Sequence, residues 1–365
     1  MNDDRVVAFR ANCYQLPREL WWPYEPPRRK LPMDEVSLVT FEVETSSGIT
    51  GMGYTQNRGG GIPVQAALDS IVGPQLIGRS TTHPNVVWDQ LQPGLARLGP
   101  GGVAALALSA ADIAMWDASA IGAGLPLHEH LGSRRQSVPA YGSSFDRLYS
   151  DEDFLETAAE YVGAGMTAVK MRVGLSSERD RHRLQILRDA SGRDLRIMVD
   201  ANSNWNLPEA LRRLPMLEEF EVDLLEEPIT PSDADGFAEI QSHTTIPIAG
   251  GENLYTTAEF VRFLHRGSLR LVQPDIGRIG GVTGWMRVAQ LAEAYNLPIS
   301  AHLMQEVSVH VMCAVKNAWM LEYAPILDPI FETPLAIAPD GSVAPPTVPG
   351  TGVRFRKELI EPYRI

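Results

Sequence analysis

The sequence predicts an α/β protein built around a parallel β-barrel. Between residues 138 and 323, eight short apolar segments alternate with stretches of amphipathic helical periodicity, which is the pattern of successive strand–helix units. Most of these segments end in an acidic residue or a histidine, as expected where parallel strands present polar side chains at one end of a barrel. A doubly wound sheet would give the same alternation, but its glycine-rich fingerprint, G-x-G-x-x-G after a first strand, is missing.

The first 130 residues predict an N-terminal α+β domain. Residues 5–16 predict a strand, and residues 36–54 predict a hairpin, because apolar and polar residues alternate around a Ser-Ser-Gly turn. Residues 63–77 and 101–122 predict helices, the second apolar nearly all round and therefore buried. Residues 20–35 predict a loop, since they are rich in proline and carry aromatic residues and three consecutive cations.

The barrel is expected to begin near residue 136. Its predicted strands read VPAYGSS, AVKMRVG, LRIMVDAN, VDLLEEP, IPIAGGEN, LRLVQPDI, LPISAHL and WMLEY. Helices are expected over residues 151–164, 176–190, 207–220, 256–266 and 282–296. The last residues are rich in proline, glycine and polar side chains and are expected to return to the N-terminal domain. The predicted division is 1–130, 136–330 and 331–365.

Composition excludes several classes of protein. The chain has 365 residues and a net charge of −13, which argues against a nucleic-acid partner because phosphate binding needs a basic surface. Its two cysteines, Cys13 and Cys313, have no metal-like spacing and fit a reducing compartment. The first residues resemble no signal peptide and no apolar run approaches a membrane span, so a cytoplasmic protein without a membrane partner is expected.

Six barrel segments end in a titratable side chain, and the spacing of these residues is regular. They lie 20 to 27 residues apart, about one strand–helix unit each, and are Asp200, Glu226, Glu252, Asp275, His302 and Glu322. One acidic residue after a strand is often a helix N-cap, but six in succession are poorly explained in that way. In a barrel the C-terminal strand ends meet at one face, where these side chains would converge.

The residue types at this face point to a metal and a base. Asp200, Glu226 and Glu252 would lie on adjacent strands and could not all stay ionised together without a cation. Oxygen ligands of this kind suit Mg²⁺. Asp275 beside His302 predicts an imidazole oriented by a carboxylate, which is a general base.

Two cations in the strand AVKMRVG need an anionic partner. Lys170 and Arg172 leave the strand on the same face, where like charges would repel each other and resist burial. A substrate carboxylate that chelates Mg²⁺ is the natural candidate. The chemistry that needs all these parts is abstraction of the proton α to a carboxylate, through an enediolate to which a protonated Glu322 could donate a hydrogen bond.

These motifs resemble the enolase superfamily, and within it the mandelate racemase subgroup of the mandelate racemase/muconate lactonizing enzyme family. The resemblance covers nearly the whole chain and rests on AVKMRVG, MVDANSNW, LEEP, GENL, PDIGRIGGVTGWMRVAQLA, SAHLMQEVSVH and MLE. It implies a modified TIM barrel, (β/α)7β, with an α+β capping domain built from the N-terminal and C-terminal segments. It also implies a homo-oligomer, an octamer or a dimer.

The resemblance assigns roles to individual residues. The implied ligands of one Mg²⁺ per active site are Asp200, Glu226 and Glu252. The implied catalytic residues are Lys170, Arg172, Asp275, His302 and Glu322. The positions that contact substrate in the subgroup are Ser143 and Asn202.

Arg172 departs from the subgroup pattern, which is Lys-x-Lys with the second lysine as the base of the opposite face. Arginine stays protonated near neutral pH and is a reluctant base, whereas a racemase wants a base on each face. A dehydratase can work with His302 alone. We therefore expect a lyase that dehydrates an acid sugar, an aldonate or aldarate, to a 2-keto-3-deoxy acid. The alternatives are a racemase or epimerase of a 2-hydroxy acid such as mandelate, and a non-catalytic protein on the same scaffold.

Substrate specificity is expected to reside in two capping loops, WWPYEPPRRK and YTQNRGGG. In the second loop, Asn57 and Arg58 suit hydroxyl groups and a distal carboxylate. Residues 28–30 in the first loop would add positive charge, although a solvated basic run explains them equally well.

Overall fold

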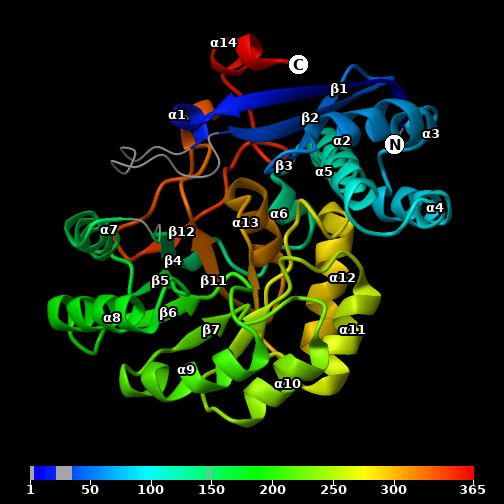
Figure 1. Cartoon of the computed structure of the whole chain (residues 1–365). Helices are drawn as coiled ribbons and strands as arrows, with labels where there is room; N and C mark the ends of the chain where they lie inside the picture. Colours follow the sequence, from blue (N-terminus) through cyan, green and yellow to red (C-terminus); the bar gives the residue numbers. More distant parts are fainter. Residues whose placement is uncertain (1–3, 22–34, 146, 148) are drawn as a thin grey trace.

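The computed structural model describes residues 4–21, 35–145, 147 and 149–365. Figure 1 shows a small antiparallel sheet with its helices lying across one end of a parallel barrel, and both chain ends lie in the sheet part. The sheet part is called the cap below. The predicted fold class, a (β/α)7β barrel with an α+β cap, is confirmed.

The cap contains a three-stranded sheet. Its strands, in the order of pairing, are β1 (Val6–Pro17), β2 (Glu35–Thr45) and β3 (Thr50–Asn57). The hairpin between β2 and β3 turns at Ser46–Gly48 as predicted, and Gly48 has a φ of 85°, which glycine adopts without strain. Gly53 lets the sheet approach the central helix of the cap, since a Cβ there would lie 2.0 Å from the Ala110 carbonyl oxygen.

The cap also contains helices, and the longest of them makes the most extensive contact with this sheet. They are α1 (Arg18–Trp21), α2 (Gly61–Ala67), α3 (Gly73–Leu76), α4 (Pro84–Ala96), α5 (Val103–Ala123) and α6 (Leu127–His130). The single helix predicted over 63–77 is wrong in detail, because a π-helical turn, η1 (Leu68–Val72), separates α2 from α3. Helix α4 was not predicted, and Pro93 and Gly94 within it weaken its helical signal.

Helix α5 corrects one expectation about apolar runs. By length and composition it could cross a membrane, but 89% of its most apolar window is buried inside the protein. It packs between the sheet and helix α12 of the barrel, which makes it the core helix that the sequence predicts. The predicted cytoplasmic location stays a prediction.

The barrel is closed by eight parallel strands. They are β4 (Val138–Phe145), β5 (Ala168–Arg172), β6 (Arg196–Asp200), β7 (Leu224–Glu226), β8 (Ile248–Gly250), β9 (Leu271–Val272), β10 (Ile299–Ala301) and β11 (Ala318–Tyr323). Neighbours in sequence pair in order, and β11 pairs with β4 to close the barrel. Six of the strands fall within the predicted apolar segments, and β4 and β11 each extend one residue beyond theirs, to Phe145 and from Ala318.

Seven helices follow the first seven strands. They are α7 (Asp151–Gly163), α8 (Ser177–Ser191), α9 (Leu207–Glu219), α10 (Ala234–Ser242), α11 (Thr257–Arg266), α12 (Gly281–Ala294) and α13 (Gln305–Ala314). Several begin at a side chain that accepts a backbone N–H, as Ser150 and Thr256 do in complete capping boxes. Helices α10 and α13 were not predicted; α10 has only nine residues, too few for clear periodicity.

The C-terminal segment contacts both the barrel and the cap. It contains η2 (Asp328–Ile330), β12 (Ser342–Val343), α14 (Lys357–Ile360) and η3 (Glu361–Tyr363). Strand β12 pairs with β4 of the barrel, and the chain then returns to the cap, where Ile365 N donates to Cys13 O. The domain boundaries drawn from the sequence stay a prediction, as does the oligomeric state.

Candidate active site

The barrel interior is layered. Its lower layer is a closed cluster of buried apolar side chains: Tyr141, Ala168, Met198, Leu224, Ala249, Leu271 and Met320. Side chains two residues further along a strand leave it on the same face, so the next layer consists of polar residues such as Lys170, Asp200 and Glu226. The polar residues that recur at regular intervals in the sequence therefore form one ring of functional groups above the apolar layer.

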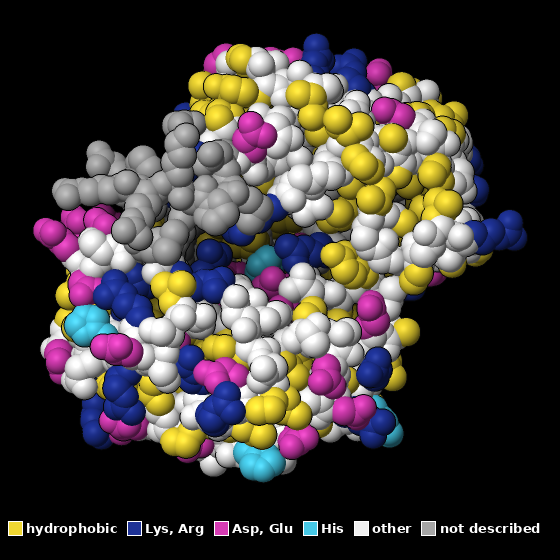
Figure 2. All heavy atoms as spheres, in the orientation of Figure 1, with side chains coloured by type: hydrophobic (Ala, Val, Ile, Leu, Met, Phe, Trp, Pro, Cys, Tyr) yellow, Lys and Arg dark blue, Asp and Glu magenta, His cyan; other side chains and the backbone are white. Residues whose placement is uncertain are grey.

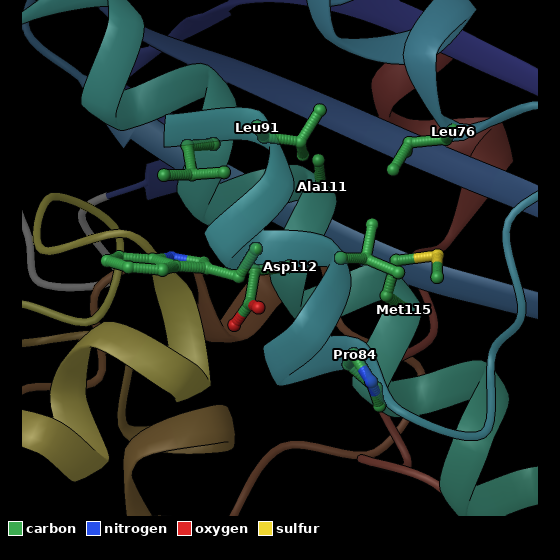
Figure 3. Close-up of a pocket in the computed structure, with 9 residues that line it drawn as sticks. Leu76, Pro84, Leu91, Ala111, Asp112 and Met115 are labelled. Atoms are coloured by element: carbon green, nitrogen blue, oxygen red, sulfur yellow. The ribbon is translucent and has the colours of Figure 1, made fainter. Parts of the chain in front are cut away.

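A cavity of about 390 Å³ lies over this ring. Figure 2 shows the corresponding hollow between cap and barrel, with basic, acidic and histidine side chains inside it. The cavity lining consists of Arg58, Ser143, Arg147, Lys170, Arg172, Asp200, Asn202, Asn204, Glu252, Arg278, His302, Leu303, Glu322, Ala324 and Ile326. A smaller cavity of about 10 Å³ inside the cap has a mostly apolar lining that includes Leu91 and Met115 (Figure 3), and it holds none of the predicted site residues.

The loops after β6 and β10 have unusual backbone geometry. Asn202 and Ser203 have φ values of 45° and 57°, and Leu303 and Met304 have values of 45° and 42°. Residues other than glycine rarely adopt this left-handed region, and each such residue costs about 1–3 kcal/mol. The strain lies beside Asp200 and His302, where it fixes the direction of the chain as it leaves the barrel mouth.

The three predicted metal ligands lie on neighbouring strand ends. Asp200 of β6 is in register with Glu226 of β7, and Glu252 follows β8. In the described part of the chain these carboxylates bind protein donors rather than forming a ready three-ligand cluster. Asp200 accepts from Asn202 N at 2.7 Å, and Glu252 Oε2 lies 3.1 Å from His302 Nε2.

The chemistry of these carboxylates fits a hard divalent cation. Burial raises the pKa of Asp200, and repulsion from Glu252 adds to the shift, which is the expected consequence of crowding anions in a desolvated site. Glu226, Asp200 and Glu252 present only oxygen donors, which suit Mg²⁺. A bound cation would relieve the repulsion among these three carboxylates, which hydrogen-bond donors of the protein offset in this structure.

The predicted base is assembled as a dyad. His302 Nδ1 lies 2.8 Å from Asp275 Oδ2, and Gly277 N donates to Asp275 Oδ1 at 2.7 Å. The carboxylate therefore orients the ring, whose Nε2 lies 3.1 Å from Glu252 Oε2 at the cavity. Burial disfavours the charged ring, but Glu252 and Asp275 outweigh it and raise the pKa of His302 to about 9. A cation held by Glu252 would oppose the effect of Glu252 and favour the neutral ring that a base requires.

Arg278 braces this dyad, although the sequence reasoning assigned it no role. Its Nε lies 3.2 Å from Asp275 Oδ2, and its Nη1 donates to Glu252 O at 2.9 Å and Asn253 Oδ1 at 3.0 Å. It thus ties the base to the loop that carries a predicted metal ligand. It lies three residues after Asp275 in the turn that precedes the next barrel helix, and this spacing of an arginine after an acidic residue is the signal that would have found it.

Lys170 and Glu322 form a buried ion-paired centre at the floor of the cavity. Lys170 Nζ lies 2.7 Å from Glu322 Oε1 and 2.8 Å from Glu226 Oε2. Burial opposes the ammonium form, but the two carboxylates raise the pKa of Lys170 well above its usual value. Gln273, also missed from the sequence, donates to Glu226 Oε2 at 2.9 Å.

Glu322 accepts hydrogen bonds in this arrangement, so the donor role suggested from the sequence, which needs a protonated Glu322, stays a prediction. Burial favours the neutral acid, but Lys170, His302 and Ser143 stabilise the carboxylate and lower the pKa of Glu322 to about 2. Ser143 Oγ donates to Glu322 Oε1 at 2.7 Å, and Leu303 N donates to Oε2 at 3.0 Å. The sequence placed the residue correctly but could not show its partners.

Most of the predicted substrate-contacting residues lie at the cavity, but not all of them do. Arg172, Asn202 and Arg58 line the cavity. Asn57 is not among the cavity-lining residues; its Oδ1 accepts from Arg58 N at 2.9 Å, so it shapes the turn at the end of β3. Residues 22–34, which include the predicted basic run, lie outside the described residues.

A parallel barrel with a carboxylate ring, an Asp–His dyad and a buried lysine beneath a cap defines an enzyme of the enolase superfamily. Residues 153–359 match the family described as enolase C-terminal domain-like, and residues 27–132 match the mandelate racemase/muconate lactonizing enzyme N-terminal domain. The chain belongs to the mandelate racemase/muconate lactonizing enzyme family, as its motifs predict.

Known relatives span more than one activity. The chain is 35% identical to a 3,6-anhydro-alpha-L-galactonate cycloisomerase of Streptomyces coelicolor over 88% of this chain and 90% of that protein. It is 29% identical to an arabinonate dehydratase of Saccharolobus solfataricus, over 90% of this chain and 91% of the relative. A crystal structure of L-talarate dehydratase from Polaromonas sp. JS666, complexed with Mg and L-glucarate, superimposes with a TM-score of 0.89 at 30% identity, covering 99% of this chain and 98% of that chain.

Proposed function

We propose that this protein is a Mg²⁺-dependent dehydratase of an acid sugar, which removes the proton α to a carboxylate and yields a 2-keto-3-deoxy acid. The observation that carries this proposal is the asymmetry of the two cavity walls. The Asp275–His302 dyad offers a base on one side, whereas β5, the strand that carries Lys170, ends in Arg172 where a second base would stand. One base is enough for dehydration, because the same imidazole can serve twice.

The residues around the floor of the cavity would hold the substrate carboxylate. Lys170, buried and protonated between Glu226 and Glu322, is a fixed positive charge for the carboxylate of the substrate. When bound by Asp200, Glu226 and Glu252, Mg²⁺ would supply the further positive charge that acidifies the α-proton and stabilises the resulting dianion.

In this reaction His302 would carry the proton from Cα to the departing hydroxyl group. His302 Nε2 takes the proton from Cα, and the electron pair of the broken C–H bond moves into the enediolate. The electron pair returns to form a Cα–Cβ double bond as the bond between Cβ and its hydroxyl oxygen breaks. His302 gives its proton to that departing oxygen, so one water leaves, and the enol product tautomerises to the 2-keto acid.

The isomerase alternative remains the second candidate, because one relative at 35% identity is a cycloisomerase. A racemase or epimerase would exchange or invert the α-proton and keep every hydroxyl group. The two readings differ in whether water leaves, which a product assay reports directly.

The test is a screen of the purified protein with Mg²⁺ against aldonates, aldarates and 2-hydroxy acids, mandelate included. Semicarbazide detects 2-keto acid, and NMR in D₂O detects exchange at Cα. Keto acid from one or a few sugar acids is the expected result. Exchange or inversion without keto acid would replace the dehydratase by the isomerase, and no reaction and no exchange with any compound would overturn both.

A further inference from the structure

The charges around the cavity nearly balance without any ligand. Five basic side chains line it: Arg58, Arg147, Lys170, Arg172 and Arg278. Three carboxylates line it as well, Asp200, Glu252 and Glu322, and two more, Glu226 and Asp275, contact lining residues from behind. With His302 in the neutral form that a base requires, the five positive and five negative charges cancel, and a divalent cation would leave two positive charges for the substrate to neutralise.

The basic side chains do not share their partners equally. Lys170 is paired with Glu226 and Glu322, and Arg278 is paired with Asp275. Arg172 makes no hydrogen bond or ion pair with the residues that the structure describes; its recorded influence is to favour ionisation of Asp200. Since Arg172 stands opposite His302 where a second base would stand, its guanidinium would face the reacting end of the substrate, and a different cation is needed for an anionic group at the far end.

Arg147 lies near the same wall on the loop that follows β4. Its Nη2 donates to Asn202 Oδ1 at 3.4 Å, which places it beside the loop after β6. The charge of Arg147 also favours ionisation of the buried Asp180 at the start of α8. The guanidinium of Arg147 therefore contacts Asn202 and is attracted by Asp180 while it lines the cavity.

Tyr149, a described residue shortly after Arg147 in sequence, is anchored to helix α8. The carbonyl oxygen of Tyr149 accepts from Arg183 Nη2 at 2.6 Å and from Arg179 Nη2 at 3.2 Å. Arg183 is 1% exposed, and its guanidinium stacks over Phe154 at 5.0 Å. Such support preorganises a binding group, which lowers the entropy cost of binding.

We propose that Arg147 binds a second, distal carboxylate, so that the substrate is a dicarboxylic sugar acid, an aldarate, rather than a monocarboxylic aldonate. This inference rests on the proposed function, in which the first carboxylate occupies the floor of the cavity beside Lys170. Similarity to relatives does not decide the matter, because arabinonate has one carboxylate and L-glucarate has two. The surplus of two positive charges matches a dianion.

The test compares pairs of acids that share hydroxyl configuration and differ only in whether the far end is a carboxylate or a CH₂OH group. Wild-type enzyme with Mg²⁺ should turn over or bind the aldarate of a pair about 10- to 100-fold better, the range expected for a charge-assisted contact. Arg147→Gln should reduce that ratio to near one, whereas Arg147→Lys should keep part of it. Arg181→Gln is the matched control, since Arg181 pairs with Glu219 on the outer helices at 2.6 Å.

Calorimetric binding in Mg²⁺ separates this proposal from the failure of the proposed function. If no acid exchanges its α-proton, but the aldarate still binds more tightly and Arg147→Gln removes the preference, the distal site stands and the dehydratase falls. Equal affinity for both members of every pair would overturn the distal site, whether or not dehydration occurs. A preference that survives undiminished in Arg147→Gln would also overturn it.

Discussion

Replacing His302 by asparagine tests the central catalytic assignment. Asparagine keeps a polar side chain that can still donate toward Asp275, which the imidazole contacts at 2.8 Å through Nδ1, but it has no group that can carry a proton at the position of Nε2. The surrounding fold should persist, because His302 lies at the rim of the apolar core rather than within it.

The expected loss follows from the lack of a substitute base. A positioned general base typically contributes about 10²- to 10⁴-fold, and His302 would act both on the α-proton and on the leaving hydroxyl. Lys170 cannot replace it, since its pKa is raised by two carboxylates, and Arg172 stays protonated. We therefore expect kcat to fall by at least about 10⁴-fold.

The assay measures keto-acid formation and Mg²⁺ affinity on the same preparations. Glu252 Oε2 lies 3.1 Å from the imidazole, so removing the ring should leave Mg²⁺ affinity equal or higher. His182→Asn is the matched control, because His182 is about half exposed on α8 and pairs with Asp151; it should keep full activity. A His302→Asn enzyme that folds, binds Mg²⁺ and retains activity within tenfold would refute the assignment of the base.

Three further predictions concern the metal and the junction of cap and barrel. Adding Mg²⁺ at about 100 times its Kd should raise the free energy of unfolding by about 2.7 kcal/mol, and Asp200→Asn should lose most of that gain in denaturant titrations. Asp112 accepts from Thr283 N at 2.8 Å and from its Oγ1 at 2.7 Å, so Asp112→Ala should cost about 2–4 kcal/mol by urea unfolding, against under about 1 kcal/mol for the exposed Asp89→Ala. Burial raises the pKa of Glu306 to about 8, and repulsion from Asp328 adds to the shift. The folded state therefore favours the neutral carboxyl, and this contribution to stability is complete below about pH 4.5 and is lost as pH rises through 8. Glu306→Gln should therefore unfold with a flatter dependence on pH between 5 and 9, and an unchanged slope would rule out Glu306 as its source.

The barrel and most of its ring could be predicted because strand periodicity fixes both. An apolar residue and a polar residue two positions later share a face, so Met198 with Asp200 and Leu224 with Glu226 reveal a core layer and a functional layer at once. Pairing along the chain then orders the strands, since parallel neighbours need a helical crossover. Strand periodicity and the helical crossover both depend on residues close together in the chain, so both can be recognised in the sequence.

What the sequence could not show depends on loops and on partners. Arg147 follows a strand without any periodic signal, and only the folded chain brings it to Asn202. The ionised state of Glu322 depends on Lys170 and Ser143, which come from two other strands. Asn57 and Arg58 are adjacent in sequence, yet the end of β3 directs only Arg58 into the cavity, because a turn separates their directions.

The return of the C-terminal segment to the cap has a consequence for how the protein is made. Tyr14 contacts Glu361 across 347 positions of sequence, so the first strand must wait for nearly the whole chain before this contact can form. At about 5–20 residues per second of synthesis, that delay is roughly 20 to 70 s. The cap and the barrel can already meet during this time through contacts such as that of Asp112 with Thr283, and only the pairing of the C-terminal segment with the first strand must follow. A translating ribosome would thus carry a nearly complete cap and barrel, and the contact between the two ends of the chain would form last.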